Sequence, residues 1–125
     1  FNEYVDAMRL PNGTDDEKAT RHAAMQAGLK SAIDIPLTTM RLGDSAWNCM
    51  IEAAKHVNYA SKSDVQVGAR ALETGIWGAW QNVIINLPDI EDEAYKTEIL
   101  KEADAIYQQA EKNCAEILDI LEKRS

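Results

Sequence analysis

Apolar residues recur along almost the whole chain at intervals of three and four positions, which is the period of an amphipathic α-helix. The apolar residues between Phe1 and Leu10 fit the last turns of a helix, and we expect that helix to begin before Phe1. The sequence Leu10-Pro11-Asn12-Gly13 ends it. No alternating apolar pattern is bounded by hairpin turns, so the sequence predicts an all-α protein.

Thr14 opens the second predicted helix. Thr14 and Glu17 have the spacing of a capping box. Pro36 predicts a break or kink, because proline lacks an N–H and disfavours helical conformation in the residue before it. We therefore expect one helix to end at about Asp34 and another to run from about Pro36 to Val57. The apolar side of this third helix contains Leu37, Met40, Trp47, Met50, Ile51 and Ala54.

Two more helices are predicted in the second half of the chain. Ser63 is a good N-cap residue, and the helix after it should reach Leu87 and stop at Pro88. Asp89 should begin the last helix, which continues to about Lys123. Its apolar positions include Ile99, Ile106, Ala110, Cys114, Ile117 and Leu121.

The length of the last helix predicts the shape of the molecule. A helix of about 30 residues is about 45–50 Å long, whereas a compact domain of this size has a radius of gyration near 14 Å. We therefore expect an elongated bundle of about four to five helices. Its flanks should be buried against other copies of the chain, as a homodimer or higher homo-oligomer, or against residues outside it.

The charge balance excludes several classes of partner. The chain has 125 residues, with 21 acidic and 13 basic side chains and a net charge of −8. We expect no binding to nucleic acid or to anionic membranes, since both require a surplus of Lys and Arg. The longest uncharged stretch, residues 74–88, is shorter than a membrane span.

Other features lead us to expect a cytoplasmic protein. There is no signal-peptide pattern at the start. Cys49 and Cys114 are far apart in helical sequence, so we expect two reduced thiols. His22 and His56 lack partners at metal-ligand spacing. The chain begins inside an apolar pattern, at Phe1, and we interpret it as the C-terminal part of a longer protein.

One stripe of the helix from Ser63 to Leu87 is small in the middle and polar at both ends. At steps of three and four it contains Asp64, Gly68, Ala71, Gly75, Gly78, Ala79, Asn82 and Asn86. Glycine is unfavourable inside a helix, so something must fit against this stripe, either another helix or a flat ligand. Asn82 and Asn86 lie one turn apart and should be partly buried. Their amides either bind a ligand or make bonds between helices or at the helix end.

These residues resemble the formimidoyltetrahydrofolate cyclodeaminase family. Residues 63–69 fit the pattern S-D-x-x-V-[AG]-A, and residues 78–87 fit G-[AV]-x-x-N-V-x-[IL]-N-L. Residues 7–11, A-M-R-L-P, and residues 35–37, I-P-L, agree as well. The resemblance covers essentially all 125 residues. The family domain is longer at its N-terminus, and the aspartate usually assigned the acid role should lie before Phe1.

The resemblance implies a fold and a reaction. The family is all-helical, dimerises through its bundle and is often fused to a formimidoyltransferase domain. It converts 5-formimidoyltetrahydrofolate to 5,10-methenyltetrahydrofolate and ammonia, while free-standing relatives hydrolyse the methenyl compound. The tetrahydrofolate derivative is the substrate, and the reaction needs no metal or redox cofactor. A helical assembly module without catalysis is the alternative from another class.

Site residues follow from the same resemblance. Asp64 is the candidate base or cation stabiliser, although an aspartate also suits the first turn of any helix. Ser63 is either a cap or a site residue, and Asn58 either holds the pterin edge or makes a turn. Asn82 and Asn86 are candidate substrate-binding amides. Three basic residues near this helix start could attract a folate (poly)glutamate tail or be ordinary surface charges: Lys55, Lys62 and Arg70.

Overall fold

The computed structural model describes residues 1–124. Its helices are α1 (Asn2–Met8), α2 (Asp15–Asp44), α3 (Trp47–His56), α4 (Lys62–Asn86) and α5 (Glu93–Lys123), with short 3₁₀ turns η1 (Tyr59–Ser61) and η2 (Leu87–Asp89). No strand occurs within these 124 residues, so the predicted all-α class is confirmed. Over the same range, no helix has the length and apolar character that crossing a membrane requires.

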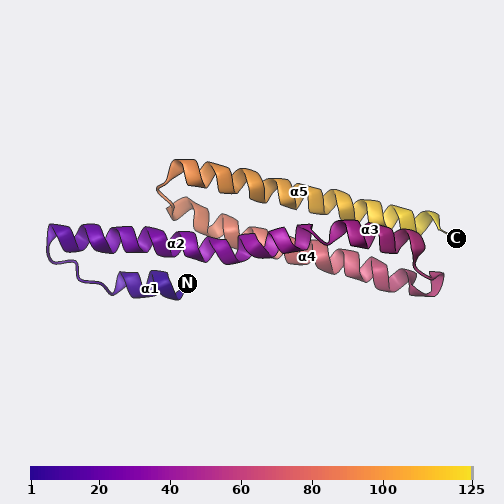
Figure 1. The fold of residues 1–125 in the computed structure, drawn as a ribbon, viewed down its shortest axis with the longest axis horizontal. Helices are drawn as coiled ribbons and strands as arrows, with labels where there is room; N and C mark the ends of the chain where they lie inside the picture. The colour runs from indigo at the N-terminus through magenta and orange to yellow at the C-terminus, as the bar shows by residue number, and fades with distance from the viewer. Residues whose placement is uncertain (125) are drawn as a thin grey trace.

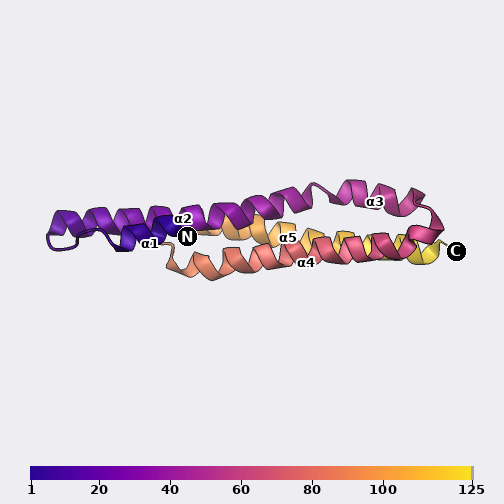
Figure 2. The ribbon, with the colours of Figure 1, turned by 90° about the horizontal axis from the view of Figure 1, so that it is seen from below.

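The helices form an elongated bundle (Figures 1 and 2). Helices α2 and α3 follow one another along the length of the molecule, α4 runs back, and α5 runs forward again. The short helix α1 folds back onto α2. Helix α5 has 31 residues, close to the length of about 30 residues that the sequence predicted.

A single core runs between α2, α3, α4 and α5. Its fully buried side chains include Ile33, Leu37 and Met40 of α2, Trp47 of α3, Ile76 and Val83 of α4, and Ile117 and Leu121 of α5. All six apolar positions expected on the last helix are buried. Burying such a side chain contributes about 1.5–3 kcal/mol, so this continuous strip is the main force holding the bundle together.

Side-chain caps set two helix starts. The capping box at α2 is confirmed: Thr14 Oγ1 accepts the Glu17 N–H at 3.1 Å, and Glu17 Oε2 accepts the Thr14 N–H at 3.3 Å. At α5 the cap is Asp92, whose Oδ1 accepts the Tyr95 N–H at 3.1 Å. The prediction that Asp89 begins the last helix is therefore wrong, because that residue ends the turn η2 instead.

The predicted break at Pro36 is also wrong. Helix α2 continues through Pro36 to Asp44, and the chain breaks two residues later, before α3. The reason is burial on both sides of the proline, at Leu29, Ile33, Leu37 and Met40. A proline inside a helix costs about 3 kcal/mol, which is less than these four buried side chains together contribute.

Ser63 is not the N-cap of α4. The helix begins one residue earlier, at Lys62, and its N-cap is Ser61, whose side chain makes no capping bond. The turn before it is set by Asn58, whose Oδ1 accepts the Ala60 N–H at 3.0 Å. Since η1 leads directly into α4, Ser63 lies in the first turn with its side chain exposed.

Candidate functional site

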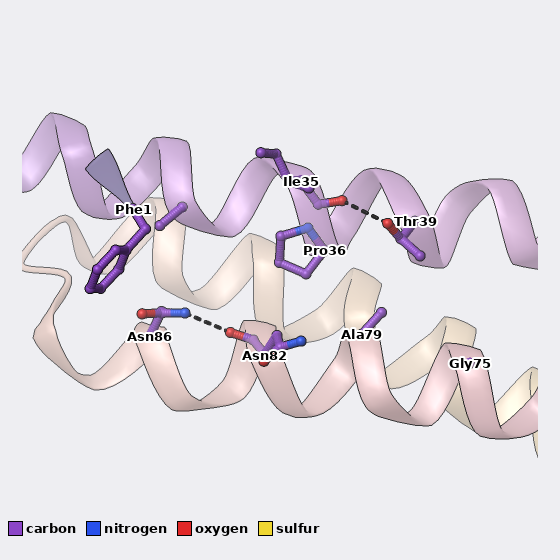
Figure 3. A pocket seen from close by; sticks show the side chains of 9 residues that line it. Phe1, Ile35, Pro36, Thr39, Gly75, Ala79, Asn82 and Asn86 are labelled. Carbon is purple, nitrogen blue, oxygen red and sulfur yellow. Dashed lines mark hydrogen bonds between the residues drawn. The ribbon is translucent and has the colours of Figure 1, made fainter. Parts of the chain in front are cut away.

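A cavity of about 430 Å³ lies between α2 and α4 (Figure 3). One wall consists of Ala32, Ile35, Pro36 and Thr39 from α2, and the other of Gly75, Ala79, Asn82 and Asn86 from α4. Phe1 lies at the end nearest Asn86. The volume is within the usual range for small-molecule sites, about 300–1,000 Å³. None of the nine lining side chains carries a charge, so the cavity suits a largely neutral group.

The α4 wall is the predicted stripe of small and amide residues. A Cβ atom added at Gly75 would meet no atom of another element within 4 Å, so none of the residues that the structure describes fills the space beside that glycine. The α2 wall was not predicted. Its residues have helical spacing around Pro36, but the cavity depends on the pairing of α2 with α4, and neither sequence pattern contains that pairing.

The two asparagines of the α4 wall are used differently. Asn86 is half-buried, and its Nδ2 donates to the Asn82 carbonyl oxygen at 2.7 Å. For Asn86 this is one of the three predicted alternatives, a bond at the helix end. Asn82 is exposed, which contradicts the expected burial of the pair. Its side-chain amide makes no hydrogen bond to any residue in the described part of the chain, so its donor and acceptor are both available to a ligand.

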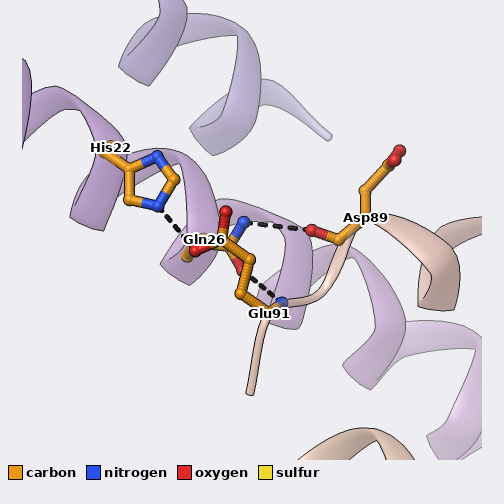
Figure 4. A network of polar contacts seen from close by, with 4 residues as sticks. All are labelled: His22, Gln26, Asp89 and Glu91. Carbon is orange, nitrogen blue, oxygen red and sulfur yellow. Dashed lines mark hydrogen bonds and ion pairs between the residues drawn. The ribbon is translucent and has the colours of Figure 1, made fainter. Parts of the chain in front are cut away.

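A polar network joins α2 to the segment after α4, near the Asn86 end of the cavity (Figure 4). Gln26 Nε2 donates to the Asp89 carbonyl oxygen at 3.0 Å, and Gln26 Oε1 accepts the Glu91 N–H at 3.0 Å. His22 Nε2 lies 2.7 Å from Glu91 Oε2. Through these contacts α2 holds the segment that follows α4, and thereby fixes the end of the helix that carries the two asparagines.

The other predicted site residues lie at the opposite end of α4. Asp64 and Ser63 are exposed in its first turn, and Asn58 caps the turn before it. Asp64 is eighteen positions from Asn82 on one helix, which is about 27 Å at a rise of about 1.5 Å per residue. One copy of the chain therefore does not bring these groups together.

The three basic residues of this end are each paired with a carboxylate. Lys62 Nζ lies 3.1 Å from Glu122, Arg70 Nη1 lies 3.1 Å from Glu73, and Lys55 Nζ lies 2.8 Å from Glu52. Lys62 also lies over the Tyr59 ring, 5.9 Å from its centroid. Each positive charge is therefore neutralised by its own carboxylate, and the three do not form a concentrated basic patch.

Cys114, Trp47 and Trp80 lie in packed surroundings that indicate structural roles. Both thiols are free, and burial raises the pKa of Cys114 to about 11, with the nearby Glu73 adding to the effect. Trp47 is in the core. Trp80 stacks on Tyr107 with ring centroids 4.6 Å apart, and its Nε1 donates to Asp104 at 2.8 Å. Residues 1–124 contain no group of three or more His, Cys, Asp or Glu side chains suited to a metal ion.

Comparison with known proteins gives the same family as the sequence resemblance. The family model described as formiminotransferase-cyclodeaminase matches residues 1–105. The formimidoyltransferase-cyclodeaminases of Gallus gallus and Dictyostelium discoideum are 43% and 42% identical over 124 residues, 99% of this chain. The chain spans 23% and 22% of those proteins.

A shorter relative has a different name. The methenyltetrahydrofolate cyclohydrolase of Methylorubrum extorquens is 33% identical over 110 residues, which is 88% of this chain and 53% of that protein. The named relatives therefore include proteins of both activities that the resemblance implied. Because the family model matches most of its length, the chain belongs to the formiminotransferase-cyclodeaminase family.

Proposed function

We propose that this chain provides part of the folate site of an enzyme that converts 5-formimidoyltetrahydrofolate to 5,10-methenyltetrahydrofolate and ammonia. The observation that carries the proposal is the uncharged cavity between α2 and α4. Its α4 wall is built from the sequence pattern that resembles the family, and both full-length relatives above are named for a cyclodeaminase.

The chemistry divides into positioning and proton transfer. N10 of the folate attacks the amidine carbon and loses its proton, and the former imino nitrogen is protonated and leaves as ammonia. A flat pteridine ring fits between Gly75 and Pro36, where the Asn82 amide can orient it by hydrogen bonds. The cavity contains no titratable side chain, so the proton-transfer groups must come from elsewhere.

We propose that a second copy of the chain supplies one of them, the base or cation stabiliser. Helix α4 exposes a second stripe, made of Val67, Ala71, Thr74, Gly78, Gln81 and Ile85, with Val67 68% and Ile85 73% exposed. Val67 and Ile85 each lie nine residues from position 76. A second α4 that runs antiparallel, with the two-fold axis passing beside position 76, therefore places Val67 next to the partner's Ile85. A Cβ at Gly78 would meet nothing within 4 Å, which allows close approach.

This pairing completes the site. It places the first turn of one α4 beside the last turns of the other, so that Asp64 of one copy approaches Asn82 and Asn86 of its partner. Asp64 then serves as base or cation stabiliser, with Asn58 and Ser63 nearby as substrate contacts. Lys62 and Arg70 are at the same end and can exchange their carboxylates for the glutamate tail of the folate.

The cyclohydrolase reaction is the second candidate, because a relative of that name covers 88% of the chain. It opens the same methenyl ring with water and could use the same cavity. The two reactions are separated by following the near-ultraviolet absorbance of methenyltetrahydrofolate. Its appearance from 5-formimidoyltetrahydrofolate supports the cyclodeaminase, and its disappearance alone supports the cyclohydrolase. Absence of both reactions would contradict an enzymatic role.

A further inference from the structure

Pro36 changes the hydrogen bonding of the α2 wall of the cavity. Inside a helix, the N–H of each residue normally donates to the carbonyl four residues earlier. Pro36 has no N–H, so the Ala32 carbonyl lacks its usual donor. Ala32 and Pro36 both line the cavity, and the Pro36 ring faces the α4 wall (Figure 3). The helix nevertheless continues for two further turns.

The other polar groups of this wall are already occupied or shared. Thr39 Oγ1 donates to the Ile35 carbonyl at 3.1 Å. Across the cavity, the Asn82 carbonyl accepts from Asn86. The Ala32 carbonyl is therefore a hydrogen-bond acceptor in the lining of the cavity. It has lost its helical donor because residue 36 is proline. Ala32 is half-buried, so access of water to this residue is restricted.

We propose that the Ala32 carbonyl accepts a hydrogen bond from an N–H group of the ligand in this cavity, and that Pro36 keeps the carbonyl available for it. The proposal rests on the proposed function, in which the ligand is a reduced folate. A tetrahydropterin carries ring N–H and amino donors along one edge of a flat ring. A carbonyl on one wall and the Asn82 amide on the other present complementary partners to such an edge.

The test compares Pro36→Ala and Pro36→Val in the natural protein at its full length. Both variants restore the N–H that closes the Ala32 carbonyl, and valine also keeps bulk close to that of the proline ring. We expect both to bind 5-formyltetrahydrofolate, a stable reduced folate, about fivefold more weakly by calorimetry, the effect of one hydrogen bond. We also expect Pro36→Ala to raise the melting temperature, since alanine is the best helix former. Pro11→Ala, in the loop before α2, is the matched control with unchanged affinity.

Each outcome decides the proposal. Weaker binding by a more stable Pro36→Ala protein, with Pro36→Val equally affected, supports it. Unchanged affinity in Pro36→Ala overturns it, and so does recovery of affinity in Pro36→Val, since ring bulk would then be the cause. A wild-type protein that does not bind 5-formyltetrahydrofolate overturns both this inference and the proposed function, whereas equal binding by wild type and variants overturns this inference alone.

Discussion

Asp64 and Asn82 face the same side of α4 but are separated by about 27 Å, because eighteen residues complete five helical turns. The candidate base and the candidate binding amide therefore lie at opposite ends of the same face of α4. An antiparallel second copy on the neighbouring stripe, which contains Val67 and Ile85, brings each Asp64 to the asparagines of the partner. The proposed site therefore exists twice per dimer, and each site draws residues from both chains.

Cysteine cross-linking tests the register of this pairing. We expect Val67→Cys chains mixed with Ile85→Cys chains, both with Cys49→Ser to remove the exposed native thiol, to form a disulfide-linked dimer under mild oxidation. Each variant alone should remain uncross-linked on a non-reducing gel, because like positions lie about 27 Å apart in the antiparallel pair. Cross-linking that is equal in the mixture and in either variant alone would argue against this register.

Mixing inactive variants tests whether the site is shared. Asp64→Asn and Asn82→Ala should each lose at least about tenfold in turnover, since one removes the base and the other an orienting amide. In a mixed dimer, one site combines the intact Asp64 of one chain with the intact Asn82 of the other. Mixing the two variants after reversible dissociation should therefore restore activity well above either alone. If both residues act within one chain, no recovery will be seen.

The helices could be predicted closely from sequence, apart from local competition at their ends. The Thr14–Glu17 box is a contact between near neighbours, so its spacing predicts it. Pro36 misled the prediction because its local preference is opposed by burial of Ile33 and Leu37, which depends on the tertiary fold. Ser63 misled it because Asn58 starts a 3₁₀ turn one turn upstream that leads into α4.

Half of the candidate site could be predicted from sequence in the same way. Asn82 and Asn86 stand on one helical stripe, and the stripe is visible in a single segment. The α2 wall, at Ala32 and Thr39, is some forty residues away along the chain. It faces α4 only because the two helices pack together, and that information is spread over the whole core.

Close packing of α1 on α2 gives a stability prediction. A Cβ at Gly28 would lie 2.7 Å from both the Cα and the N of Tyr4, which are backbone atoms that cannot move aside cheaply. Gly28→Ala should therefore lower the free energy of unfolding by about 1–3 kcal/mol in urea titrations. Gly13→Ala is the matched control, because its Cβ would meet only Glu17 Oε2 at 3.4 Å. Equal stability of the two variants would contradict the close contact.

The Arg41–Glu102 pair gives a pH prediction. Arg41 Nε and Nη2 donate to the two carboxylate oxygens of Glu102 at 2.6 and 2.9 Å, and these bonds lower the pKa of Glu102 below its ordinary 4.5. A lowered folded-state pKa means that the stabilisation is present above the ordinary value and is lost as the pH falls through the folded-state value.

Melting curves across pH check this sign. Glu102→Gln should lower the melting temperature at neutral pH, and the difference from wild type should shrink as the pH falls below 4.5. Glu98→Gln, at an exposed position of the same helix, should leave the melting temperature nearly unchanged throughout. A difference for Glu102→Gln that is constant with pH would mean that charge pairing is not its cause.

The measurement that tests the account most directly is the steady-state conversion of 5-formimidoyltetrahydrofolate by wild type, Asn82→Ala and Asn48→Ala. It is followed by methenyl absorbance and by ammonia release. Asn48 is an exposed asparagine on α3, outside the cavity. We predict one ammonia released per methenyl group formed, kcat/KM reduced about tenfold or more in Asn82→Ala, and no change in Asn48→Ala. Absence of turnover by wild type, or equal kcat/KM in wild type and Asn82→Ala, would contradict the assignment of this cavity as the folate site.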